Sequence, residues 1–320
     1  MGKRVKVKRE KAPKLNIEVL RHGAEQQSKM MAVLLTGVVC AIPVGFLLLL
    51  SRRGNMNSMI YSLLSWYALG WMITLTAANG HRGMLQRKFP KSRVIGTAYP
   101  ELRMHINQLC RYLDIRKAPD TFVIDTPQIG ASVRGMGAPY LVLSSRMLQV
   151  MSEAELNVLL CVLLSHVKAA TVKWRTFIAT LDELNPLTRL LALPYVLMAL
   201  LMRNYLDYSQ QTADRLALLL LDGNYQLLTT TIIKTQALTS ESITPQQAKQ
   251  LEKFLNQEGV QARAEDVEHM YILNQMIREI PGLKERVEGI TSTPNEPRFQ
   301  EQLAIMTERI ARYQSASRGM

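Results

Sequence analysis

The chain has 320 residues, 48% of them hydrophobic, and a formal net charge of +13. This length allows a sizeable core and exceeds that of a single average domain. The three cysteines are an odd number and widely spaced, which excludes a disulfide framework and a Cys-x-x-Cys metal site. A reducing compartment is therefore favoured.

Basic side chains concentrate in two places. Residues 1–29 contain nine basic and three acidic side chains, and residues 81–93 contain five lysines and arginines and no acid. Each cluster adjoins an uncharged apolar run, the position where cytoplasmic lysines and arginines are in excess. Because no nucleic-acid-binding motif accompanies the charge, we predict membrane lipid as a partner and no nucleic acid. A basic protein that binds lipid headgroups or nucleic acid through residues 1–29 is a further alternative.

Two long uncharged runs predict an N-terminal transmembrane helical hairpin. Met30–Leu50 has 21 residues without a charge, about 30 Å of helix and the thickness of a hydrocarbon core. Met56–Ala78 is a second uncharged run, separated from the first by only Ser-Arg-Arg-Gly-Asn. The basic flanks place residues 1–29 and everything after Gly80 in the cytoplasm. We therefore expect a multi-pass protein of the inner (cytoplasmic) membrane with most of the chain cytoplasmic.

The chain after the hairpin has the pattern of an α+β, mostly helical region with a small sheet. Residues 99–115 place apolar residues at helical spacing. Asp120–Thr126 and Tyr140–Ser145 have the pattern of buried strands, and Gly130–Pro139 that of a glycine-punctuated loop.

Several helices follow. Ser152 and Glu155 form a capping box at the start of one helix, and Asp207–Gly223 predicts another helix that ends at a glycine. Leu190–Met202 is apolar but only 13 residues long, which predicts a buried, tilted or membrane-interfacial helix. Three further segments have helical period, at 229–238, 244–259 and 264–280.

The order of these pieces is similar to that in a known family. An apolar hairpin, strand, glycine loop and strand are followed by "SEAELNVLLCVLLSH" (Ser152–His166), an apolar helical pair and "SQQTADRLA" (Ser209–Ala217). This order resembles the HtpX-like and CAAX-prenyl-protease-type membrane zinc metallopeptidases, over residues 30–240 and more loosely at "STPNEPRF" (292–299). The resemblance implies a zincin-like domain.

We accordingly divide the chain into four parts. They are a basic tail (1–29), the transmembrane hairpin (30–80), a degenerate metallopeptidase-like domain (81–284) and a C-terminal helical segment (285–320).

The family's active site can be carried over residue by residue. Its first helix contains His-Glu-x-x-His, and its second contains Glu-x-x-x-Asp. His166 matches the first zinc ligand, whereas Val167 replaces the general-base glutamate and Ala170 the second histidine. Gln210 replaces the glutamate ligand, and Asp214 matches the supporting aspartate. The resemblance thus implies a vestigial site in which His166 is the only retained ligand-type residue, and no metal or cofactor is expected.

The chemistry of these substitutions predicts loss of catalysis. Catalytic zinc needs three protein ligands and an open position. The spacing of His166 and Ala170 puts both on one helix face, but alanine has no lone pair, and Val167 cannot transfer a proton. We therefore predict a pseudopeptidase that holds or regulates a partner protein at the cytoplasmic membrane face. The alternative is an active membrane zinc metalloendopeptidase with non-standard ligands.

Individual residues allow other roles. His166 is either a relic ligand or, as we favour, a core histidine with a partner such as Asp214. Gln210 is expected to line a vestigial cleft. Gly130, Ala131 and Ser132 lie where the resemblance places an extended substrate against an edge strand, a binding mode that needs no metal. A plain hairpin connection is the alternative for these three residues.

Overall fold

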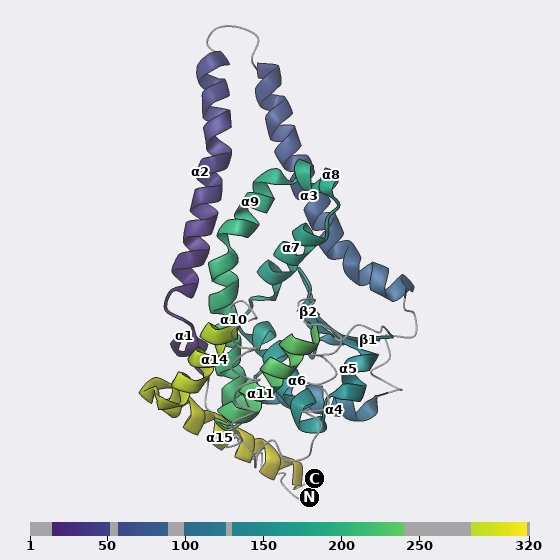
Figure 1. The fold of residues 1–320 in the computed structure, drawn as a ribbon, viewed down its shortest axis with the longest axis vertical. Helices are drawn as coiled ribbons and strands as arrows, with labels where there is room; N and C mark the ends of the chain where they lie inside the picture. Colours follow the sequence, from purple (N-terminus) through teal and green to yellow (C-terminus); the bar gives the residue numbers. More distant parts are fainter. Residues whose placement is uncertain (1–14, 52–56, 89–98, 126–129, 240–282, 319–320) are drawn as a thin grey trace, which may run out of the picture.

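The computed structural model describes residues 15–51, 57–88, 99–125, 130–239 and 283–318. In these stretches the chain is mostly helical with one small sheet, which confirms the predicted α+β class at this level (Figure 1). The basic residues 1–14, residues 52–55 of the predicted turn with the adjacent Met56, and the predicted helical segments 244–259 and 264–280 lie outside the described residues.

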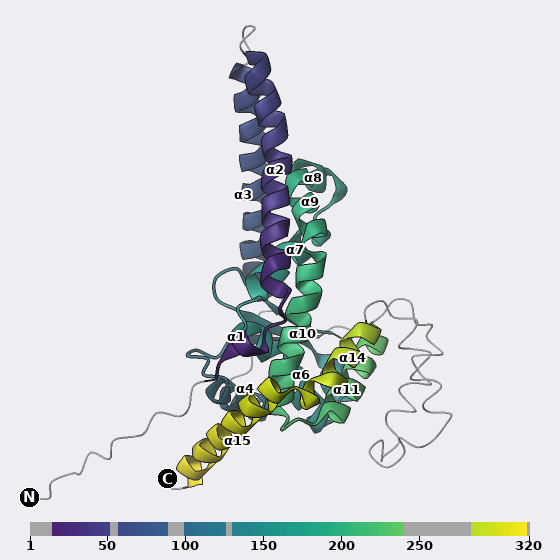
Figure 2. The same cartoon turned by 90° about the vertical axis from the view of Figure 1, so that its left-hand side faces the viewer.

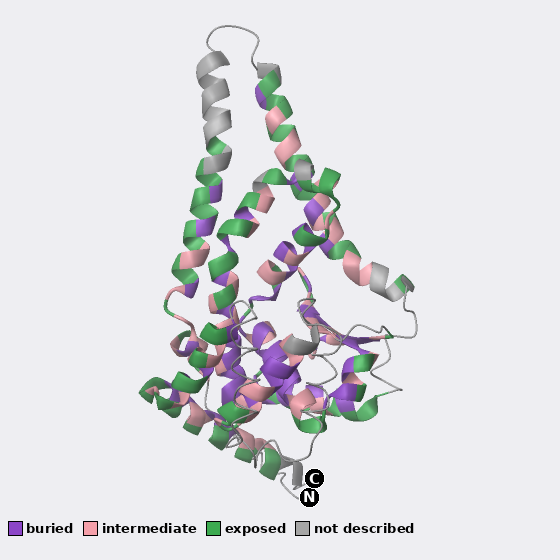
Figure 3. Cartoon of the chain, in the orientation of Figure 1, coloured by how far each residue is buried: buried purple, intermediate pink, exposed green. Residues whose placement is uncertain are grey.

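Two long helices project beyond the rest of the molecule (Figures 1 and 2). They are α2 (Glu25–Ser51) and α3 (Asn57–Lys88). In the described part of the chain, one stretch, Met59–Gly83 of α3, is by itself long and apolar enough to cross a membrane. Many large apolar side chains on both helices are exposed (Figure 3): Met30, Met31, Leu34, Val38, Tyr61, Leu69, Trp71 and Met72.

The sheet contains one strand that the sequence pattern missed. β1 (Asp120–Ile124) and β3 (Tyr140–Ser144) match the predicted strands, and they pair in parallel. The predicted loop instead contains β2 (Ala131–Arg134), which pairs antiparallel with β3 and gives the order β1-β3-β2. Only Val133 of β2 is buried, so the alternation that reveals a strand is weak. Gly135, with φ +134°, turns the chain toward β3 where a Cβ atom would meet the Ala138 carbonyl.

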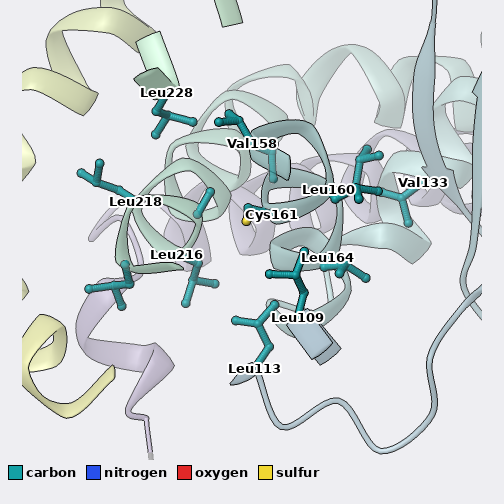
Figure 4. Close-up of a cluster of buried hydrophobic side chains, with 14 of the residues drawn as sticks. Leu109, Leu113, Val133, Val158, Leu160, Cys161, Leu164, Leu216, Leu218 and Leu228 are labelled. Carbon is teal, nitrogen blue, oxygen red and sulfur yellow. The ribbon is translucent and has the colours of Figure 1, made fainter. Parts of the chain in front are cut away.

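The centre of the main core is α6 (Glu153–Lys168). Its predicted capping box is confirmed, with Ser152 Oγ accepting from the Glu155 amide and Glu155 Oε2 accepting from the Ser152 amide. Leucine, valine and cysteine side chains of α6 pack against side chains of other elements (Figure 4). Those neighbouring elements include α4 (Pro100–Tyr112), β2, α10 (Arg203–Leu220) and α11 (Tyr225–Thr239). α5 (Ser145–Val150) connects β3 to α6.

The apolar run Leu190–Met202 contains the whole of one helix, α9 (Leu193–Leu201), and the last two residues of another, α8 (Pro186–Leu191). The two helices are separated at Ala192, and Pro194 lies in the first turn of α9, where proline is tolerated. α9 packs against α2 and α7 (Val172–Glu183), so it joins α2 to the body of the molecule. α10 follows α9 directly and begins four residues before the predicted start.

Both ends of the described chain pack on this same body. α1 (Ile17–Leu20) contacts α10, and the C-terminal elements are α14 (Leu283–Ser292), the short 3-10 helix η2 (Thr293–Asn295) and α15 (Pro297–Arg318). The predicted domain boundary at 284/285 falls inside α14. Ile290, Phe299 and Met306 of the C-terminal segment belong to the same buried cluster as α6.

Candidate functional site

A cavity of about 490 Å³ lies between β2 and helices α6, α7, α10, α11 and α14. Five of the predicted site residues line it: Gly130, Ala131, Ser132, His166 and Gln210. The fold therefore brings the predicted strand-binding segment and two of the residues predicted to form a vestigial zinc site to one space. Leu159, Val162 and Leu163 of α6 form an apolar wall of the same cavity.

The imidazole of His166 has a hydrogen-bond partner on each nitrogen. The ring is buried, with 3% of the residue exposed. Nδ1 lies 3.0 Å from the Thr171 hydroxyl, and Nε2 lies 3.1 Å from Oε1 of Gln210. The suggested partner Asp214 is not in direct contact with the ring, because Gln210 stands between them and donates to Asp214 through its Nε2 at 3.2 Å. His166 is thus a satisfied buried histidine.

This network assigns the tautomer of His166. The Gln210 amide donates to Asp214, so its oxygen faces the ring and accepts the hydrogen of Nε2. Nδ1 then accepts from Thr171. Burial, followed by the nearby Arg175 guanidinium, holds the pKa of His166 well below its ordinary value of 6.5. The imidazole is therefore neutral at physiological pH.

Asp214 on α10 pairs with an arginine far away in the sequence. Arg286 on α14 donates to the two carboxylate oxygens, through Nε at 2.6 Å and Nη2 at 2.7 Å. Asp214 is 1% exposed, so this is a bidentate and nearly fully buried ion pair. Removing one partner of such a pair costs about 3–5 kcal/mol, since it leaves a buried charge uncompensated. The pair links α14 in the C-terminal segment to α10, which carries Gln210 of the cavity lining.

The expected position of Ala170 on the helix face of His166 is wrong. α6 ends at Lys168, and Ala170 lies beyond the helix, exposed and with φ +58°. The amides of Ala170 and Thr171 donate to the carbonyls of Val167 and His166, the pattern of a Schellman turn. Ala170 therefore faces solvent, and the chain reverses into α7 there. Val167 is partly buried and packs against the main core.

The edge strand β2 has backbone groups on its outer side that no described residue pairs with. The Ser144 amide donates to the Gly130 carbonyl at 2.9 Å, so the alternation of an antiparallel ladder turns Ser132 toward β3 and Ala131 and Val133 outward. Consistent with this, the amide of Gly135 points outward and donates to Thr176 Oγ1 on α7 at 2.9 Å. Ala131 and Val133 have no backbone hydrogen bond to a described residue on that side.

These residues do not fit a zinc ion. Both nitrogens of His166 are engaged, and its Nε2 carries a hydrogen in place of a lone pair. The Asp214 carboxylate is taken by Arg286, and the guanidinium groups of Arg175 and Arg286 line the same cavity, which disfavours a dication there. In the described stretches, no group of three or more His, Cys, Asp or Glu side chains is arranged to hold a metal.

Sequence patterns missed Thr171, Arg175 and Arg286. Thr171 follows His166 by five residues but contacts it only because the chain turns back at Ala170. Arg286 is 72 residues from Asp214, and no local spacing links them. Arg175 lies on α7, which was not predicted as a separate helix. Its only sequence signal is a basic residue close to the vestigial motif.

No family model matches the chain, and comparison with curated proteins and with solved structures also finds no match.

Proposed function

We propose that the chain is a catalytically inactive, HtpX-like metallopeptidase homologue that binds an extended segment of a partner protein. The observation that carries this proposal is the cavity in which the outward edge of β2 faces His166 and Gln210. A strand added to a sheet edge gains main-chain hydrogen bonds and needs no metal or general base. Val167 and Ala170 at the positions of base and second ligand agree with binding in place of hydrolysis.

The proposed location is the cytoplasmic face of a membrane, with α2 and α3 as a transmembrane hairpin. Met59–Gly83 meets the length and composition of a span, and residues 30–50 within α2 contain no charge. The exposed apolar side chains on both helices form a larger apolar surface than a soluble protein normally presents to water. The proposed partners are membrane lipid around the hairpin and a protein segment in the cavity.

A peptide-binding measurement tests the function. The full-length protein in lipid nanodiscs is titrated into a positional-scanning library of fluorescein-labelled nonapeptides, read by fluorescence polarisation. Ala131→Pro removes the outward N–H of Ala131 without touching the β3 ladder, and we expect it to weaken binding about tenfold or more. Ala131→Gly keeps the N–H and should bind within about twofold of wild type.

Two results contradict the proposal. One is peptide binding that Ala131→Pro leaves unchanged while its melting temperature shows a folded protein. The other is one zinc per chain by metal analysis, lost in His166→Ala together with a chelator-sensitive peptidase activity, which would support the active metalloendopeptidase in its place.

A further inference from the structure

Arg175 differs from the other arginines of the cavity in its surroundings. Three arginines line the cavity: Arg134, Arg175 and Arg286. Arg134 pairs with Glu183 at 2.6 Å, and Arg286 pairs with Asp214. The backbone amide of Arg175 donates to the Thr171 carbonyl, but its guanidinium makes no ion pair or hydrogen bond with any residue in the described part of the chain.

The charge of Arg175 is retained at neutral pH. Burial, then the neighbouring Arg286, lowers the pKa of Arg175 to about 10. Asp214 and Asp207 attract it at longer range, but Asp214 is already committed to Arg286. Asp182, the one carboxylate residue in the cavity lining, lies on the exposed side of α7. A guanidinium in this position has unused donors with the geometry that suits a carboxylate.

Arg175 is also close to the binding edge. The adjacent residue Thr176 accepts the Gly135 amide at the end of β2. α7 therefore covers the outer edge of the chain at Gly135 but not at Ala131 and Val133. Ala131, Val133 and Arg175 all line the cavity. A strand paired with Ala131 and Val133 lies in the same space as this guanidinium.

We infer that Arg175 sets the specificity of the cavity, which binds an extended peptide carrying an aspartate or glutamate side chain that pairs with the guanidinium. This inference rests on the proposed function, because the backbone of the peptide is held by β2. The peptide's carboxylate supplies the counter-charge that Arg175 lacks, and the partial burial of Arg175 strengthens the pairing.

The same nonapeptide library tests the inference, at physiological ionic strength so that bulk attraction to a +13 protein is screened. We expect enrichment of Asp and Glu at one interior position. Replacing that acid by its amide should weaken binding to wild type about tenfold or more. Arg175→Gln should abolish this difference, and Arg175→Lys, which keeps the charge, should retain part of it.

Lys173→Gln provides the matched control, since Lys173 is exposed on the same helix, outside the cavity lining, and carries the same charge. It should leave the preference for the acid unchanged, and an equal loss in both variants would overturn the inference. A preference that disappears on C-terminal amidation would overturn it as well. Binding that depends on Ala131 but shows no acidic preference would overturn the inference and leave the proposed function standing, whereas absence of edge-dependent binding would contradict the proposed function itself.

Discussion

The burial of His166 couples its protonation to the stability of the fold. Its folded-state pKa is held low by burial and by Arg175, while the unfolded chain has the ordinary value of 6.5. Below pH 6.5 the unfolded state therefore binds a proton that the native state does not. The contribution of His166 to the free energy of unfolding is therefore fully present above pH 6.5. It is lost as the pH falls toward the folded-state pKa, by up to about 1.4 kcal/mol per pH unit.

Unfolding of the wild type and of His166→Gln between pH 8 and pH 5 measures this contribution. The variant should be less stable at pH 8 by about 1–3 kcal/mol, through lost packing and an unpaired partner, and should lose less stability on acidification. His22, whose pKa is also lowered by burial and then by Arg215, is present in both proteins and cancels in the comparison. Equal pH dependence of the two proteins would mean that His166 does not titrate with folding.

Among the helices and strands, the C-terminal end of α6 fixes where the residues after His166 lie. The Schellman turn places Ala170 in the left-handed region, with φ +58°, at a cost of about 1–2 kcal/mol for an L-residue. The chain leaves the helix before the position of the second ligand, and α6 and α7 meet at 103°. This turn brings Thr171 to His166 and Arg175 into the cavity.

Ala170→Gly should stabilise the protein by about 0.5–1 kcal/mol, because glycine adopts the left-handed conformation without strain. The greater conformational entropy of glycine in the unfolded chain offsets part of this stabilisation. The adjacent Ala169 is a control of opposite sign. It is buried, with φ −72°, so Ala169→Gly should destabilise by a similar amount. Thermal unfolding of both variants in detergent checks the pair, and a destabilised Ala170→Gly protein would contradict the turn.

For the whole molecule, the proposed hairpin makes the orientation testable. Basic residues before α2 and after α3, with only two arginines between the apolar runs, favour cytoplasmic ends. Reporter fusions after residue 29 and after residue 100 should both report the cytoplasmic side, and an insertion at residue 54 should report the opposite side. A fusion at 29 or 100 that reports the outer side would contradict the orientation and, with it, the proposed cytoplasmic location of the cavity.

Features that depend on neighbouring residues could be predicted from the amino-acid sequence. The capping box at Ser152 requires only Glu155 three residues later, and β1 and β3 have apolar runs with clear boundaries. Helices with apolar residues at regular spacing, such as α4, were predicted for the same reason. The residues that form each of these patterns are close together in the sequence.

The arrangement of the site could not be predicted from local sequence, because it depends on contacts between distant parts of the chain. β2 forms because β3 supplies its hydrogen-bond partners, and a short polar segment has no pattern of its own to reveal it. Arg286 reaches Asp214 across 72 residues, and Arg175 enters the cavity because the chain reverses at Ala170. The physical reason is common to all three: the free energy of each arrangement comes from burying and pairing groups that only the completed core brings together.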